Sequence, residues 1–268
     1  FPAMGIQGAA LATLISRCLE LLLVFLYARF YNREIRVRAR YLLHTEKVLI
    51  RDFLVYSIPV VLNEVMWGFG TSANTAVLGH LGSAAIAANS VAQVARQLAT
   101  VVAFGLSNAT AIYLGKTIGE QKMELAKACS RRFIVLSVVM GLAGGLLILA
   151  ATPLAVSALS LTAQAKEYLK IMFLVMSYFV VAQAYNTTMV VGIFRAGGDT
   201  RFGLILDVST MWGCSILLGA LAAFVWKWSV PAVYVLLMSD ELIKVPVTTI
   251  RYRKYIWLRN KIGNPVER

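Results

Sequence analysis

The stretch FLVYSIPVVLNEVMWGFGTSANTAVL (residues 53–78) carries a single charged residue, Glu64. A run of about 20 predominantly apolar residues is enough for a helix to cross a hydrocarbon core about 30 Å thick. Pro59 suits a helix that bends, because proline removes one backbone donor. The run therefore predicts a membrane-spanning helix with a carboxyl group near its middle.

The rest of the chain has the same character. Its 268 residues are 59% hydrophobic and 15% charged, with a mean hydropathy of +0.72, which excludes an ordinary soluble domain. We predict an all-α polytopic membrane helix bundle. About seven transmembrane helices are expected, at residues 5–28, 53–78, 89–115, 133–156, 171–193, 203–226 and 231–250.

The formal net charge of +13 would suit a nucleic-acid partner, but the positions of the basic residues argue for another explanation. Twenty of the 26 Lys and Arg residues lie in alternate links and the C-terminal tail, and only three lie in the other links. This asymmetry is the positive-inside pattern of membrane proteins. We therefore predict a multi-pass protein of the cell (inner) membrane with a cytoplasmic C-terminus, the lipid bilayer as a partner and no nucleic acid.

The first residue is Phe1, and no basic signal-peptide segment precedes the first apolar run. We interpret the chain as a C-terminal fragment of a longer protein, and FPAMGIQ (residues 1–7) as an external turn that leads into the first span. The three cysteines, Cys18, Cys129 and Cys214, are scattered, so neither a disulfide framework nor a metal site is predicted.

Glu64 lies on the polar side of its predicted helix. Asn63, Trp67 and Asn74 share one stripe, and Glu64 lies on the adjacent stripe with small and hydroxyl residues. An ionised, unpaired carboxylate at this depth is costly, so it should take up a proton or find a cation. We predict that Glu64 is a cation-coupling residue for H⁺ or Na⁺, with no other cofactor. The alternative is a carboxyl group that hydrogen-bonds a neighbouring helix.

Other polar side chains recur at helical spacing in the third and fifth predicted spans. Together with the 53–78 helix they would line one polar cavity, although such residues also join helices by hydrogen bonds. The substrate-cavity candidates are Asn63, Trp67, Asn74, Gln93, Gln97, Tyr178, Gln183, Tyr185 and Asn186.

The remaining charges within the spans suit local pairs. Arg17 and Glu20 are three residues apart, while Lys244 follows Glu241 by three residues and Asp240 by four. Such spacings place the partners on one face of a helix, so we predict structural ion pairs. Asp207 lies near the expected cytoplasmic end of its span, and its role is left open.

Several segments in order resemble the multidrug and toxic compound extrusion (MATE) transporter family. They are GIQGAALATLISRCLELL in the first span, PVVLNEVMWGFG in the second, the turn LGHLGSAAIAANSVA, the segment GLSNATAIYLGKTIGE and the motif GIFRAGGDTRF after the fifth span. The resemblance runs along essentially the whole chain. The order and spacing of the segments together make the resemblance specific.

The resemblance implies a twelve-helix protein of two six-helix lobes, of which this chain would hold the sixth helix and the second lobe. Residues 1–52 would be the last helix of the missing N-terminal lobe and the cytoplasmic interlobe loop, 53–250 the C-terminal six-helix lobe, and 251–268 a basic cytoplasmic tail. It also implies a secondary active antiporter, not an enzyme, that exports organic cations or other amphipathic drugs in exchange for Na⁺ or H⁺ by alternating access.

In the resemblance, Glu64 matches an acidic residue that the family often carries in its seventh helix and associates with cation coupling. One bacterial branch also has an acidic residue in its tenth helix, where this chain has the uncharged run from Gln183 to Asn186. Another branch couples through an acidic residue of the first helix, which this chain does not include. The resemblance therefore leaves the choice between Na⁺ and H⁺ open.

A lipid flippase and a membrane enzyme are the two rival functions. A lipid-linked precursor flippase of the same wider superfamily would share the architecture, but it should line its cavity with cations for a pyrophosphate, and Arg96 is the one candidate within the cavity-forming spans. A membrane enzyme should show clustered Asp or His residues at a membrane face, whereas His44 and His80 lie in unrelated links.

Overall fold

The computed structural model describes residues 5–31 and 47–258, and the chain divides into two units, Phe1–Phe53 and Leu54–Arg268. Parts of three predicted features lie outside the described residues. These are the start of the external turn (1–4), the centre of the interlobe loop (32–46) and the end of the basic tail (259–268).

The first unit contains one complete helix, α1 (Gly5–Leu26), which continues into the π-helical turn η1 (Tyr27–Tyr31). The stretch from Ala10 to Tyr31 is long and apolar enough to cross a membrane. The predicted pair within it is confirmed, because Arg17 Nη1 lies 2.7 Å from Glu20 Oε2.

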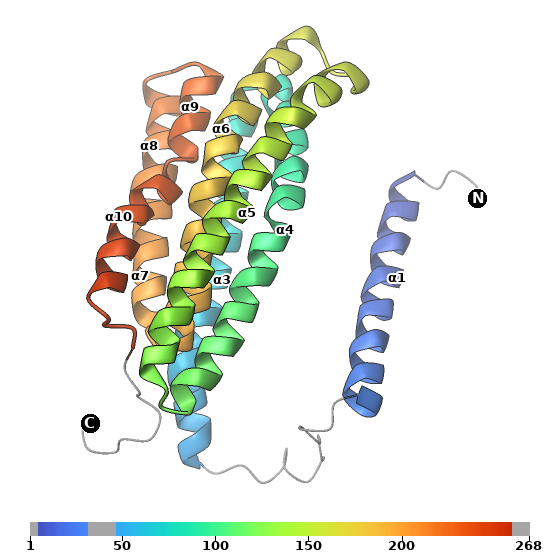
Figure 1. Ribbon diagram of the computed structural model, residues 1–268. Coiled ribbons are helices and arrows are strands. Elements are labelled where there is room, and N and C mark those ends of the chain that lie inside the picture. Colours follow the sequence, from blue (N-terminus) through green and yellow to red (C-terminus); the bar gives the residue numbers. More distant parts are fainter. Residues whose placement is uncertain (1–4, 32–46, 259–268) are drawn as a thin grey trace. The chain divides into compact units, whose positions relative to one another are not determined.

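The second unit begins within α3 (Lys47–His80), and three more long helices follow: α4 (Ser83–Gly119), α5 (Met123–Ala158) and α6 (Ala163–Thr187). Figure 1 shows α4, α5 and α6 running alongside one another. The links between α3, α4 and α5 are tight turns. The turn between α3 and α4 contains Gly82 at φ 117°, a backbone conformation that only glycine adopts at low cost.

Three π-helical segments interrupt the later helices. α6 passes into η2 (Thr188–Phe194), and the helix that begins with α7 (Thr200–Thr210) continues through η3 (Met211–Ile216), α8 (Leu217–Ala220) and η4 (Leu221–Val225). Short π segments change which side chains face a neighbour and are frequent at functional sites.

Six helices of the described chain are long and apolar enough to span a membrane. The predicted seventh span, residues 231–250, is instead divided into α9 (Val230–Leu237) and α10 (Asp240–Arg253). The sequence at the break gives the reason. Asp240 and Glu241 occupy the first turn of α10, where the positive end of the helix dipole favours carboxylates.

Glycines let the central helices approach closely. Gly141 and Gly145 of α5 face the backbone of α6 at Val181 and Ser177, and Gly144 faces the Ala99 carbonyl of α4. Without a hydrophobic driving force in lipid, such close packing of small residues is what holds membrane helices together. The α4–α5–α6 core supports the side chains described next.

Candidate functional site

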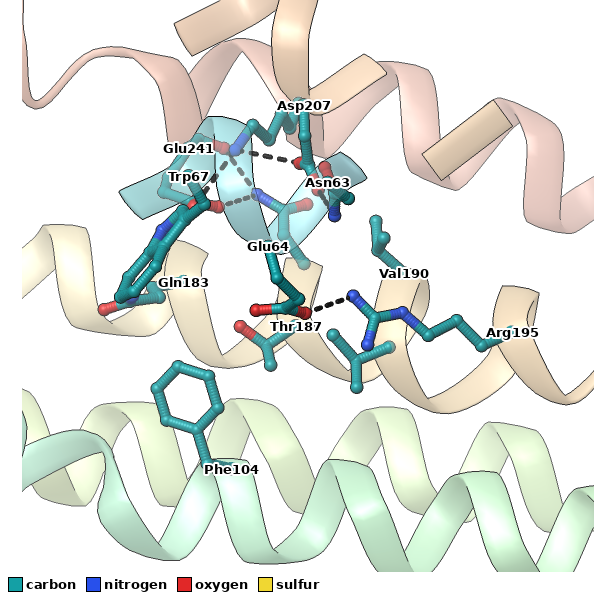
Figure 2. A pocket seen from close by; sticks show the side chains of 13 residues that line it. Asn63, Glu64, Trp67, Phe104, Gln183, Thr187, Val190, Arg195, Asp207 and Glu241 are labelled. Atoms are coloured by element: carbon teal, nitrogen blue, oxygen red, sulfur yellow. Dashed lines mark hydrogen bonds and ion pairs between the residues drawn. The ribbon is translucent and has the colours of Figure 1, made fainter. Parts of the chain in front are cut away.

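A charged pocket of about 90 Å³ opens among the helices of the second unit (Figure 2). Five stretches of chain far apart in sequence supply its wall. The lining residues are Asn63, Glu64 and Trp67 of α3, Phe104 of α4, Gln183, Asn186 and Thr187 of α6, Val190, Val191 and Arg195 in or next to η2, Asp207 of α7, and Glu241 and Lys244 of α10.

Glu64 is paired in this conformation. Arg195 Nη2 donates a hydrogen bond to Glu64 Oε1 at 2.7 Å, and the two side chains are 21% and 58% exposed respectively. In Figure 2 Arg195 reaches Glu64 from one side, while Trp67 and Gln183 lie on the other. Both side chains line the pocket, so a second cation that enters the pocket can compete with Arg195 for Glu64.

Lys244 is the centre of a second, buried charge cluster. Its Nζ lies 3.1 Å from Asp207 Oδ1, 3.2 Å from Asp240 Oδ2 and 3.2 Å from Glu241 Oε1, and its side chain is 4% exposed. The predicted pairs of Lys244 within α10 are therefore confirmed. The contact with Asp207 gives that residue, whose role the sequence left open, a place in the same cluster.

Two carboxamides extend this cluster. Asn186 Nδ2 donates to both the carboxylate (2.8 Å) and the main-chain oxygen (2.6 Å) of Glu241, and its Oδ1 accepts from Thr248 at 3.2 Å. Asn63 Nδ2 donates to Asp207 Oδ2 at 2.9 Å. Hydrogen bonds from neutral amides orient the carboxylates without neutralising them.

The charges around the pocket do not balance. Arg96 of α4 lies close enough to Asp240 and Glu241 to interact electrostatically with both. Lys244 and Arg96 thus face three carboxylates, those of Asp207, Asp240 and Glu241, while Glu64 and Arg195 neutralise each other. Counted as formal charges among the described side chains, the cluster has one more carboxylate than cations, so it favours the uptake of a monovalent cation or a proton.

The structure brings four of the nine substrate-cavity candidates to the pocket beside Glu64, namely Asn63, Trp67, Gln183 and Asn186. The other five lie elsewhere. Asn74 is buried on α3, Gln97 and Tyr178 are exposed, Gln93 accepts a hydrogen bond from Arg96 at 2.8 Å, and the Tyr185 hydroxyl lies 2.6 Å from that of Thr249.

Four residues line the pocket although the sequence pattern did not place them there: Arg195, Asp207, Glu241 and Lys244. The sequence carries one signal that the last apolar run is divided. Ser-Asp-Glu at 239–241 is typical of a helix start, and it interrupts this run. No comparable signal pairs Arg195 with Glu64, since the two residues are 131 positions apart.

The chain is similar in sequence to known proteins. The MatE family model matches residues 59–221. The Probable multidrug resistance protein YoeA of Bacillus subtilis (strain 168) is 23% identical over 271 residues, covering 100% of this chain and 58% of that protein. The Probable multidrug resistance protein NorM of Brucella suis biovar 1 (strain 1330) is 25% identical over 267 residues, covering 96% and 55%. The chain thus spans a little over half the length of these relatives.

A solved structure shows the same fold. An outward-facing conformation of a multidrug resistance MATE family transporter of the MOP superfamily matches with a TM-score of 0.78 at 18% identity, covering 94% of this chain and 56% of that chain. The all-α polytopic bundle predicted from the sequence is therefore confirmed. Since the family model matches more than half of its residues, this chain belongs to the MatE family, the transporter family that its motifs resemble.

Proposed function

We propose that the chain forms the second lobe of a secondary active antiporter that exports organic cations or other amphipathic drugs in exchange for Na⁺ or H⁺. The observation that carries this proposal is the charged pocket, with Glu64 on its wall and a deficit of one positive charge. In its complete form the protein would have two six-helix lobes in the cell membrane and a cytoplasmic C-terminus.

Glu64 is the proposed cation-coupling residue. When a cationic substrate replaces Arg195 as its partner, the carboxylate contributes to binding. When H⁺ or Na⁺ reaches the carboxylate instead, the attraction is lost and the substrate leaves. Competition of two ligands for one charge couples their movements, because the binding of either ligand weakens the binding of the other. Each ligand shifts the population of the transporter's two access states only by its differential affinity for them.

Aromatic residues support a broad choice of substrate. Trp67 and Phe104 line the pocket beside the charged groups, and Trp67 is 41% exposed. A flat cation can stack on such rings without having one particular shape. The small volume of the pocket indicates that it receives a head group, while the rest of an amphipathic molecule lies outside it.

The alternative, a lipid-linked precursor flippase, is not favoured by the wall of this pocket. A pyrophosphate requires an excess of cations, whereas the pocket wall carries three carboxylates, of Glu64, Asp207 and Glu241, and two cations, Arg195 and Lys244. The described charges therefore attract cations and repel phosphates.

Glu64→Gln is expected to abolish gradient-driven efflux, because glutamine keeps the shape of the side chain but cannot exchange a cation. The measurement uses the full-length parent protein in proteoliposomes, with a fluorescent organic cation and imposed pH or Na⁺ gradients. Glu124→Gln, at an exposed glutamate of α5 outside the pocket, serves as the matched control. Efflux by Glu64→Gln at the wild-type rate would mean that coupling resides elsewhere.

Arg195→Gln is expected to tighten binding of a cationic substrate by about two- to five-fold, because the substrate no longer competes with the guanidinium for Glu64. Equilibrium titration of the full-length protein with the same fluorescent cation would measure the change in Kd. The gain should disappear in the double variant Glu64→Gln, Arg195→Gln. A gain that persists there would show that Arg195 does not act through Glu64.

A further inference from the structure

The turn between η2 and α7 (residues 195–199) begins with Arg195, the partner of Glu64, and ends with Asp199. Hydrogen bonds within this part of the chain fix the shape of the turn. The Gly197 nitrogen donates to the Ile193 carbonyl at 3.1 Å, and the Asp199 nitrogen donates to the Phe194 carbonyl at 2.8 Å. These bonds do not fix where the turn lies relative to α3, which carries Glu64. That position depends on contacts of the turn with other helices.

The end of the turn is tied to α10. Asp199 directly precedes α7, where an aspartate often caps its own helix, but its side chain makes no such hydrogen bond. Instead Arg251, in the last turn of α10, donates to both carboxylate oxygens, from Nε to Oδ2 at 2.7 Å and from Nη2 to Oδ1 at 3.0 Å. The same guanidinium lies over the Phe202 ring, 4.1 Å from its centroid. Because the ion pair has two contacts and a stacked ring, it fixes direction as well as distance.

The middle of the turn packs against Trp257. This side chain follows α10 and is fully buried among apolar side chains of α4, α5, η2 and α7. Its ring is parallel to that of Tyr252 with 5.8 Å between centroids, and the Tyr252 hydroxyl lies 2.8 Å from Ser130 Oγ of α5. A Cβ on Gly197 would overlap the main-chain carbonyl oxygen of Trp257. Trp257 thus anchors the chain after α10 directly beside the turn.

The turn also contacts α3. A Cβ on Gly198 would lie 3.4 Å from Cε1 of Tyr56, which is eight residues before Glu64 on the same helix. The turn is therefore held between α3 and residues 251–258, the C-terminal clasp, which contains Arg251 and Trp257. Without the clasp, the contacts that tie the end and the middle of the turn to α10 and the chain after it would be lost. Arg195 would then be free to move away from α3.

We infer that Asp199, Arg251 and Trp257 are positioning residues for the proposed coupling site. The C-terminal clasp holds the turn against α3 so that Arg195 stays paired with Glu64, and opening the clasp frees Glu64 for a cation. None of the three residues belongs to the pocket wall described above, so their effect on Glu64 passes through Arg195. The inference rests on the proposed function for the use of the freed carboxylate, whereas the pairing itself can be measured without a substrate.

The test follows the reactivity of Glu64 in the full-length protein in detergent, without substrate or ion gradient. A water-soluble carbodiimide with glycine ethyl ester converts an accessible carboxyl group to an amide, and mass spectrometry of the peptide that contains Glu64 gives the rate. We expect Arg195→Gln to raise this rate about two- to five-fold, because the guanidinium no longer occupies the carboxylate. Asp199→Asn, which breaks the contact with Arg251, should raise the rate by most of the same factor.

A double variant separates positioning from a general loosening of the bundle. If the clasp acts through Arg195, Asp199→Asn combined with Arg195→Gln should react no faster than Arg195→Gln alone. The matched control is Glu120→Gln, which breaks an exposed ion pair with Lys122 at the end of α4 and should leave the rate at the wild-type value. Rate increases that multiply in the double variant would show an effect that bypasses Arg195, which would overturn the inference.

Arg251→Lys makes the same decision if Asp199→Asn fails to fold. Lysine retains the charge but not the two-point contact, so the labelling rate should lie between those of wild type and Arg195→Gln. A wild-type rate in the folded clasp variants, with a raised rate in Arg195→Gln, would overturn the inference. Titration with the fluorescent organic cation then tests the proposed function separately. Faster labelling in the clasp variants without binding of the cation would support the clasp and count against the proposed function.

Discussion

Lys244→Met is expected to destabilise the second unit by about 3–5 kcal/mol, because it leaves the buried carboxylates of Asp240 and Glu241, and the half-buried carboxylate of Asp207, without the ammonium that contacts all three. Methionine retains most of the volume of the lysine stem, so the loss reports on charge and not on a cavity. Thermal unfolding of the full-length protein in detergent, followed by its tryptophan fluorescence, should show a Tm several degrees below wild type.

The control and the rescue are matched to this reasoning. Lys170→Met removes an exposed lysine of α6 and should leave Tm nearly unchanged. Adding Glu241→Gln to Lys244→Met removes one of the stranded carboxylates and should restore part of the loss, as is expected when a buried charge cluster is dismantled as a set. A Lys244→Met protein that melts with the wild type would contradict the proposed charge count at this site.

Gly145→Ala is the second substitution with a large expected effect. A Cβ at this position would overlap the main-chain carbonyl oxygen of Ser177 on α6, and backbone cannot move aside as a flexible side chain can. We expect a loss of about 1–3 kcal/mol and looser α5–α6 packing. The same thermal unfolding measurement applies, with efflux as a second readout because α6 carries Gln183 and Asn186.

Gly105→Ala provides the opposite case within the same bundle. Gly105 lies within α4 with no neighbouring atom where its Cβ would be placed, so alanine should stabilise the helix slightly, by about 0.5–1 kcal/mol. If both alanine variants raised Tm equally, the close contact between Gly145 and Ser177 would not be limiting, and the α5–α6 interface would have to be more adaptable than its geometry indicates.

The class of fold and the local part of the charge pattern follow from the sequence alone. Hydropathy indicates membrane helices because a helix pairs its own backbone groups, and this requirement depends on each segment alone. For the same reason the pairs Arg17–Glu20 and Lys244–Glu241 could be predicted, since their partners lie one helical turn apart. The motifs that resemble the MATE family are likewise a property of the chain in order.

The assembly of the pocket depends on tertiary packing. The contact of Asn63 with Asp207 joins residues 144 positions apart, and that of Arg195 with Glu64 joins residues 131 apart. Such contacts depend on how helices pack and on the π segments and the break before Asp240 that turn side chains toward one another. No periodicity within one helix carries that information, because it describes which face a residue occupies and not which helix that face meets.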